Sequence, residues 1–262
     1  MGKKKQASAG KKAVFNKHVY YERAVQNPQN EVEFLDKEYK RLRGKKPQIL
    51  REDFGGTGYL SCEWVKYRKE NKAVAIDLDS DPINYGKENH YSKLSDEQKK
   101  RMSYLKGNVL SPKNPQADII CAFNFSYFIF KKRKQLLDYF KMAKKTLKKD
   151  GVFFIDLFGG PESQTVMVEV ANHGDFKYYW DCQKFNPITN ECLFAIHFKD
   201  KNGKKHKNSF VYDWRLWSLP ELIDILEEAG FSKIIPYWEG DGEDGDGDGE
   251  FYPAKDEENC QS

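Results

Sequence analysis

The glycine-rich stretch REDFGGTG, residues 51–58, has the composition of a turn that holds a nucleotide-like ligand. Its glycines allow the backbone to turn sharply and to approach a ligand closely. Glu52 and Asp53 directly precede the glycines, and two carboxylates at close range oppose the binding of a pyrophosphate. Tyr59 also stands where a phosphate-binding turn carries a lysine. The turn therefore favours a ligand with positive charge and no phosphate.

A further acid, Asp77, ends the next apolar run, KAVAIDLD. A carboxylate at this place can accept hydrogen bonds from both hydroxyls of an adenosine ribose. It serves a nicotinamide dinucleotide and S-adenosylmethionine equally well, so it indicates an adenosine ligand without choosing between them. S-adenosylmethionine suits the first turn, because it presents a sulfonium and an ammonium and has no phosphate. An NAD-dependent oxidoreductase and a catalytically idle Rossmann-like binding protein are the alternatives.

Alternating strand and helix patterns surround these two acids from about residue 46. The five strand patterns before residue 160 are PQILRED, KAVAIDLD, SYLKGNVL, ADIICAFNF and VFFIDLFGG. An amphipathic helix pattern fills residues 131–151, with Gly151 as its C-cap. Such alternation implies parallel strands with helices on both faces, and ligands bind beyond the carboxyl ends of the strands. With later strands such as SKIIPYWE, the sequence predicts a Rossmann-like, doubly wound, mostly parallel seven-stranded sheet.

Three aromatic strand patterns follow the fifth strand: FKYYWDCQKF, ECLFAIHF and NSFVYDWRLW. They predict an antiparallel insertion over residues 176–217, which we expect to cover the substrate. Alternation places Arg215 on one face of the last pattern and Tyr212 and Trp214 on the other. Arg215 is a candidate clamp for an anionic group of the substrate, although such an arginine more often pairs with a nearby acid such as Asp213.

The ordered motifs resemble those of the class I S-adenosylmethionine-dependent methyltransferases over roughly residues 46–238. The first motif of that family reads acid-x-Gly-x-Gly-x-Gly, and residues 52–58 match it with Phe54 in place of the first glycine. This variant resembles a branch whose first motif reads L-R-E-D-F-x-G-T. Asp77 matches the ribose-binding acid, and Asn108 matches the position that faces the adenine amine. The resemblance implies cofactor-binding roles for Tyr21, Glu52, Phe54, Gly55, Gly56, Gly58, Asp77, Leu78, Asn108, Val109 and Asn124.

The acceptor in this family meets the methyl group near the end of the fourth strand, where the stretch NFSY begins at Asn124. The stretch is similar to the N-P-P-Y motif of amine-directed methyltransferases but lacks both prolines. Asn124 and Tyr127 are therefore the candidate catalytic residues. Tyr20 and Tyr21 are expected to form an N-terminal lid, with Tyr20 and Arg215 as candidate substrate-binding residues. No catalytic triad is visible, and methyl transfer needs mainly alignment and desolvation.

The resemblance predicts methyl transfer to a nitrogen, oxygen or sulfur atom of a small molecule. The aromatic insertion favours this acceptor class over the alternative, a protein or a nucleic acid. That alternative is supported by the mildly basic charge of residues 13–238, which we assign as the methyltransferase domain.

The two ends of the chain are strongly charged. Residues 1–12 carry five lysines and no acid, and they predict a disordered basic tail. Residues 239–262 predict a flexible acidic Gly/Asp-rich loop and C-terminus. Part of this segment is similar to the opening of a calcium-binding loop, but Lys255 stands where the last glutamate ligand is required, so we expect no metal site.

The composition also bears on location. No apolar run is long enough to span a membrane, and the N-terminus lacks the apolar stretch of a signal peptide. The five cysteines include no C-x-x-C pair, which favours a reducing compartment. We therefore expect a cytoplasmic protein without a membrane partner, with a nuclear location as the alternative.

Overall fold

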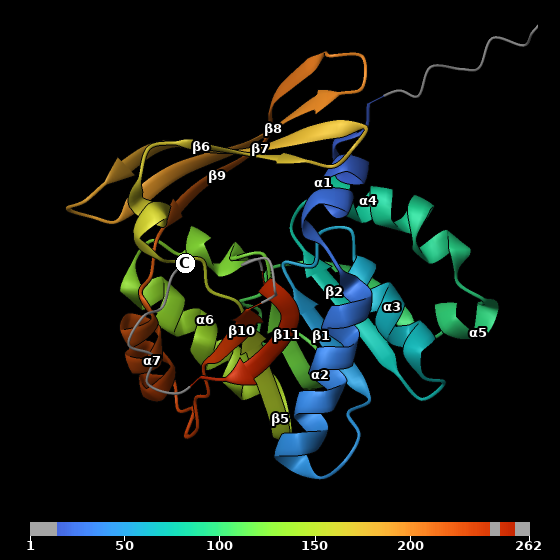
Figure 1. The fold of residues 1–262 in the computed structure, drawn as a ribbon. Helices are drawn as coiled ribbons and strands as arrows, with labels where there is room; N and C mark the ends of the chain where they lie inside the picture. Colours follow the sequence, from blue (N-terminus) through green and yellow to red (C-terminus); the bar gives the residue numbers. More distant parts are fainter. Residues whose placement is uncertain (1–14, 242–246, 255–262) are drawn as a thin grey trace, which may run out of the picture.

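A five-stranded parallel sheet forms the centre of the computed structural model, which describes residues 15–241 and 247–254 (Figure 1). The strand order is β3-β2-β1-β4-β5. The strands are β1 (Ile49–Asp53), β2 (Lys72–Asp77), β3 (Met102–Lys106), β4 (Ala117–Ala122) and β5 (Leu147–Ile155). Because the chain reverses its direction of strand addition between β1 and β4, a ligand crevice is expected at the carboxyl ends of these two strands.

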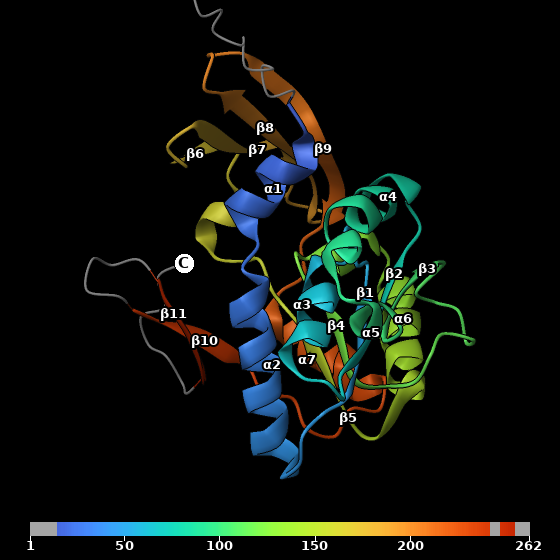
Figure 2. The ribbon, with the colours of Figure 1, turned by 90° about the vertical axis from the view of Figure 1, so that its right-hand side faces the viewer.

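Helices cover both faces of this sheet (Figure 2). One buried cluster joins the sheet to α2 and α3, and a second joins it to α6 and α7. Helix α2 shows why these segments are helical, because Val32, Leu35 and Tyr39 form its buried stripe and Gly44 ends it in the left-handed region. The helices are α1 (Lys17–Val25), α2 (Pro28–Arg43), α3 (Tyr59–Tyr67), α4 (Ser80–Asn89), α5 (Asp96–Lys99), α6 (Arg133–Thr146) and α7 (Leu219–Glu228).

A second, antiparallel sheet lies over the end of the first (Figures 1 and 2). Its strands, in the order β6-β7-β8-β9, are β6 (Val168–Asn172), β7 (Phe176–Asn186), β8 (Glu191–Asp200) and β9 (Lys205–Arg215). Residues paired across neighbouring strands share one face, as Trp180 does with Ile196 and Phe194 with Tyr212. The apolar face of this sheet is therefore mostly aromatic.

The expected seven-stranded sheet is wrong for the described residues, in which the main sheet has five strands. The expected last strand, SKIIPYWE, contains Pro236, which has no N–H group to donate to a central sheet. Strand β10 (Tyr237–Asp241) begins after this proline and pairs with β11 (Gly247–Pro253) in a separate hairpin. The aromatic segment predicted as an insertion forms the separate antiparallel sheet, and the sequence analysis missed its edge strand β6.

Two boundaries also differ from the sequence prediction. The helix expected over residues 131–151 ends at Thr146, because Leu147 pairs with Ala117 of β4 and the Lys148 ammonium lies 3.0 Å from the Asp118 carboxylate. These tertiary contacts override the helix propensity of the lysine-rich end.

The segment expected as a flexible acidic loop over residues 239–262 includes part of the β10–β11 hairpin. Its aromatic residues account for this order, because the rings of Tyr237 and Phe251 pack on Phe34 of α2 with centroids 5.4 and 5.6 Å away. Residues 242–246 and 255–262, and the expected tail at residues 1–12, lie outside the described residues. None of the described helices is long and apolar enough to cross a lipid bilayer.

Candidate functional site

The glycine turn joins β1 to α3 and requires glycine for steric reasons. Gly56 and Gly58 have φ values of 52° and 64°, in the left-handed region. A Cβ at Gly58 would lie 2.6 Å from the ring of Tyr104, and a Cβ at Gly55 would lie 2.9 Å from that of Ala75. The N–H group of Gly56 donates a 2.8 Å hydrogen bond to the Asp77 carboxylate. The turn is therefore held against the end of β2.

The two acids before the glycines lie on opposite sides of β1. Glu52 accepts hydrogen bonds from the hydroxyl of Ser61 at 2.6 Å and from its N–H group at 3.1 Å. Asp53 is 1% exposed and makes a two-pronged ion pair with Arg51, at 2.9 and 3.1 Å. Successive residues of a strand point to opposite faces, so only Glu52 faces the turn. Both acids were expected to oppose a phosphate at this turn, but Asp53 points away from it and is neutralised by Arg51.

Phe54 keeps the backbone conformation that a glycine would adopt at this position. Its φ is 57°, which is rare for a bulky side chain and costs on the order of 1–3 kcal/mol. Its ring makes edge contacts with Phe130 and Tyr139 in the core, with centroid distances of 6.0 and 5.4 Å. The ring of Phe54 therefore packs among core residues, away from the ligand side of the turn. Only the backbone of Phe54 can face a ligand.

The ends of β2 and β3 place three of the expected residues at one edge of the sheet. The Asp77 carboxylate accepts a second 2.8 Å hydrogen bond, from the N–H group of Asp79. The next side chain, Leu78, is 62% exposed although it is apolar. Asn108 is exposed, and its amide oxygen accepts a 2.8 Å hydrogen bond from Leu110. Val109, expected beside it, is buried in the core instead.

The turn after β4 has an unusual conformation that a missed residue stabilises. Asn124 and Phe125 have φ values of 56° and 55°, and their N–H groups donate to the Asp156 carboxylate at 2.6 and 3.0 Å. Desolvation raises the pKa of Asp156 to about 7. The signal in the sequence was an acid directly after the apolar run VFFI, the same arrangement that marked Asp77.

Tyr127 is a packed residue of this turn rather than a ligand-facing one. Its side chain is fully buried, and its hydroxyl donates a 2.6 Å hydrogen bond to the backbone oxygen of Asp156. Burial raises the pKa of Tyr127 well above its usual range. The catalytic role expected for Tyr127 is therefore dropped, since its only polar atom is committed inside the fold.

Acidic groups accumulate around the glycine turn. Desolvation raises the pKa of Glu52 to about 8 and that of Glu31, near the start of α2, to about 7. The carboxyl group of Glu31 also raises the pKa values of both Glu52 and Asp156. A negative charge raises the pKa of a carboxyl group only when the two lie near each other, so this region suits a positively charged ligand.

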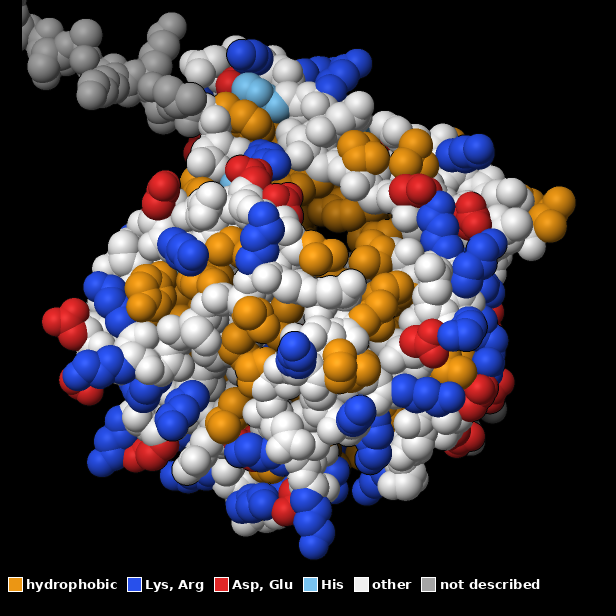
Figure 3. Space-filling view, turned by 180° about the vertical axis from the view of Figure 1, so that it is seen from behind, with side chains coloured by type: hydrophobic (Ala, Val, Ile, Leu, Met, Phe, Trp, Pro, Cys, Tyr) orange, Lys and Arg blue, Asp and Glu red, His pale blue; other side chains and the backbone are white. Residues whose placement is uncertain are grey.

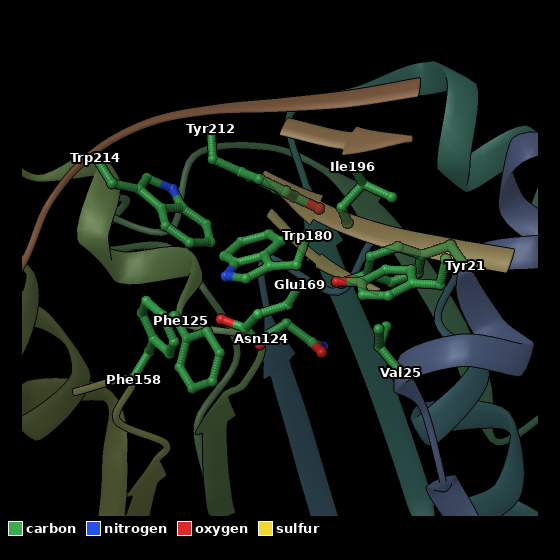
Figure 4. Close-up of a pocket in the computed structure, with 11 residues that line it drawn as sticks. Tyr21, Val25, Asn124, Phe125, Phe158, Glu169, Trp180, Ile196, Tyr212 and Trp214 are labelled. Atoms are coloured by element: carbon green, nitrogen blue, oxygen red, sulfur yellow. The ribbon is translucent and has the colours of Figure 1, made fainter. Parts of the chain in front are cut away.

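A cavity of about 210 Å³ separates the turn after β4 from the antiparallel sheet (Figure 4). The antiparallel sheet contributes Glu169, Tyr178, Trp180, Ile196, Tyr212 and Trp214 to its lining. The remainder of the molecule contributes Tyr21, Val25, Asn124, Phe125 and Phe158. From behind, the surface shows a hollow surrounded by hydrophobic side chains (Figure 3). Of the predicted site residues, Tyr21 and Asn124 line this cavity.

Tyr20 and Arg215 do not line the cavity, contrary to the sequence prediction. The ring of Tyr20 packs against Phe176 and Phe198 of the antiparallel sheet, with centroids 4.7 and 5.5 Å away. The guanidinium of Arg215 pairs with Glu221 at 2.9 Å and lies 3.7 Å over the ring of Trp217. Because both side chains have partners inside the fold, neither is available to a substrate in the cavity.

No protein-family model matches the chain, and no curated protein matches its sequence. Solved structures do resemble it. A S-adenosylmethionine-dependent methyltransferase from Clostridium acetobutylicum has a TM-score of 0.64 at 18% identity, over 81% of this chain and 85% of that one. A sugar N-methyltransferase from Streptoalloteichus has a TM-score of 0.61 at 14% identity, over 91% and 92%.

A third similar structure is an amino pentose methyltransferase from Micromonospora echinaspora, solved with S-adenosylmethionine bound. Its TM-score is 0.64 at 11% identity, over 90% of this chain and 95% of that one. At these identities the likeness concerns the fold. The chain therefore has the fold of class I S-adenosylmethionine-dependent methyltransferases.

Proposed function

We propose that this chain transfers the methyl group of S-adenosylmethionine to a small molecule. The proposal rests on one observation, which is that two features of the molecule lie on either side of Asn124. On one side lies an acidic glycine turn without a phosphate-binding lysine, and on the other lies a cavity lined mainly by aromatic side chains. A donor on the turn and an acceptor in the cavity would meet at the end of β4.

The residues around the turn fit the donor. Each oxygen of the Asp77 carboxylate accepts one backbone hydrogen bond and keeps a further lone pair for a ribose hydroxyl. Leu78 offers an exposed apolar side chain for the adenine ring, and Asn108 lies at the end of the neighbouring strand. A Cβ at Gly56 would meet no atom within 4 Å, so the turn is open at this point. Glu52 lies where a carboxylate can attract the ammonium of the donor.

Methyl transfer from this donor requires little from the protein beyond correct positioning of the two reactants. S-adenosylmethionine supplies a methyl group on a good leaving group, the sulfonium. The turn at Asn124, held by Asp156, fixes the boundary between the donor side and the cavity. The rings of the antiparallel sheet exclude water and hold the acceptor in line with the methyl group.

The acidic surroundings disfavour the alternative of an NAD-dependent oxidoreductase, because a pyrophosphate would approach Glu52 and its acidic neighbours. A catalytically idle binding protein would need neither the acids nor the cavity. A small-molecule acceptor fits better than a macromolecular one, since the cavity has a volume of only about 210 Å³ and is lined by side chains from both parts of the fold.

Calorimetric titration of the full chain tests the proposal. We expect S-adenosylmethionine and S-adenosylhomocysteine to bind, and NAD and NADP to bind far more weakly or not at all. Tight binding of a nicotinamide nucleotide without binding of either sulfur ligand would overturn the proposal. Incubation of the protein with labelled donor and extracted metabolites, peptides or RNA then identifies the acceptor class.

A further inference from the structure

Aromatic rings form most of the lining of the cavity beside Asn124. Trp180 comes from β7, and Tyr212 and Trp214 come from β9; the ring centroids of Trp180 and Tyr212 are 5.8 Å apart, and those of Tyr212 and Trp214 are 4.4 Å apart. Tyr21 of α1 lies opposite them, and Phe125 and Phe158 close the side near β4 (Figure 4). The face of an aromatic ring carries partial negative charge and attracts a cation within about 6 Å of its centroid.

The single charged group of the lining has the sign that favours a cation. Glu169, on β6, lies directly opposite Trp180 in the sheet, and its carboxylate points into the space among the rings (Figure 4). No lysine, arginine or histidine is among the described residues that line the cavity. Burial and the nearby Tyr21 hydroxyl raise the pKa of Tyr178, and the charge of Glu169, whose side chain is itself exposed, raises it further.

We propose, on the basis of the methyltransferase function inferred above, that the acceptor is a compact aliphatic amine that is methylated on nitrogen. The amine enters as an ammonium ion, which the rings bind by cation–π attraction and Glu169 binds as its counter-ion. A cation–π contact is stronger the further it is removed from water. The cavity volume of about 210 Å³ corresponds to roughly seven water molecules, which limits the bound group to a small one.

The transfer step also favours nitrogen. The ammonium first loses one proton to water at the open side of the cavity. The nitrogen lone pair then forms a bond to the methyl carbon while the sulfur–carbon bond breaks, and its electron pair remains on sulfur. The products are S-adenosylhomocysteine and an N-methyl ammonium ion, so the positive charge moves from sulfur to nitrogen.

A cage that attracts cations therefore stabilises the charge that develops on the acceptor nitrogen in the transition state. A thiolate or an alkoxide would instead bring negative charge next to Glu169, which opposes its binding. The same cavity thus discriminates among the three acceptor atoms by charge.

Matched acceptors test this inference. The full chain, saturated with S-adenosylhomocysteine, is titrated with cyclohexylamine and with cyclohexanol, which differ in charge but little in size. We expect the amine to bind at least about tenfold more tightly, equivalent to about 1.4 kcal/mol. Equal affinity, tighter binding of the alcohol, or binding of neither compound would overturn the inference.

Variants identify the groups responsible. We expect Glu169→Gln and Trp180→Leu each to weaken amine binding by about tenfold and to leave S-adenosylhomocysteine affinity unchanged. Glu162→Gln is the matched control, because Glu162 is an exposed acid close in sequence that does not line the cavity. An unchanged amine affinity in Glu169→Gln would contradict the assigned role of this carboxylate. Failure of S-adenosylhomocysteine to bind the native protein would instead refute the proposed methyltransferase function itself.

Discussion

The parallel and antiparallel sheets contribute different chemistry to two sides of one space. The parallel sheet presents backbone N–H groups and carboxylates at the ends of its strands, and these are already hydrogen-bonded to each other. Asp77 and Asp156 each accept two backbone hydrogen bonds. The antiparallel sheet presents rings from the face of its strands, and these contact mainly other rings. One side is fixed by directional bonds and the other by packing.

This difference indicates how each side tolerates change. A hydrogen-bonded turn loses its geometry when one acceptor is removed, because the freed N–H groups have no other partner. A packed wall of several rings loses binding strength gradually as single rings are replaced. We therefore expect large effects from substitutions around the glycine turn and graded effects from substitutions in the cavity.

Helix α1 links the two sides. Its Tyr21 lines the cavity, and the neighbouring Glu22 is buried and accepts hydrogen bonds from the Thr57 hydroxyl at 2.8 Å and from the His90 ring at 2.6 Å. Thr57 belongs to the glycine turn, so the helix that closes the cavity is also bonded to the donor side.

The largest effect is expected for Asp77→Ala. Loss of two charge-assisted hydrogen bonds to a ribose costs about 3 kcal/mol, which weakens S-adenosylhomocysteine binding by about 100-fold. Calorimetric titration measures this affinity. The control is Asp138→Ala, which removes an exposed acid of α6 whose partner, within the described part of the chain, is Lys134. If the Asp77→Ala protein is folded and binds S-adenosylhomocysteine within about threefold of the native affinity, Asp77 does not contact the donor.

A somewhat smaller effect is expected for Asp156→Ala. The N–H groups of Asn124 and Phe125 lose their acceptor, so the free energy of unfolding should fall by roughly 2 kcal/mol in urea titrations. Asp156→Asn keeps one carbonyl acceptor and should lose about half as much. Equal stability of both variants and the native protein would show that the turn does not depend on this carboxylate.

The dependence of stability on pH tests three acids that lie on the side of the parallel sheet. The pKa values of Glu31 and Asp156 are raised to about 7 and that of Glu52 to about 8, so folding without ligand favours their neutral forms. The free energy of unfolding should therefore be highest at pH values below the pKa that these carboxyl groups have in the unfolded chain. It should fall as the pH rises from about 5 to 8.

A cationic donor reverses this preference, because it favours the ionised carboxylates. Binding of S-adenosylmethionine should release protons, and each proton released tightens binding by about tenfold per pH unit. Titrations at pH 6, 7 and 8 in buffers of different ionisation enthalpy measure both quantities. Glu52→Gln should reduce the slope, whereas an affinity independent of pH would show that these acids do not face the donor.

The smallest effect is expected for Arg215→Lys. The variant loses the stacking on Trp217 and part of the ion pair with Glu221, which should cost about 1 kcal/mol of unfolding free energy. The KM of the acceptor should stay within about twofold of the native value, since Arg215 lies outside the cavity. A much larger rise in KM would restore Arg215 as a substrate-binding residue.

Local patterns in the sequence determined which residues meet at the edge of the parallel sheet. The glycine turn, Asp77, Leu78 and Asn108 lie there as predicted, because the carboxyl ends of parallel strands share one edge, and their role in binding the donor stays a prediction.

Only the tertiary structure decided which of these candidates reach the ligand space. Tyr127, Phe54 and Val109 occupy motif positions but point into the core, and strand spacing alone cannot tell the two directions apart. Asp53 and Arg215 are neutralised by Arg51 and Glu221, and neither pairing follows from the residue types.

The acceptor cavity likewise depends on contacts between distant segments. Alternation predicted that Tyr212 and Trp214 share a face, but it could not show which surface that face would cover. Glu169 lies on an edge strand that the sequence analysis missed, and Asp156 acts on a turn about thirty residues away. Hydrogen bonds and apolar burial act over a few ångströms in space, so only the folded chain shows which residues share a site.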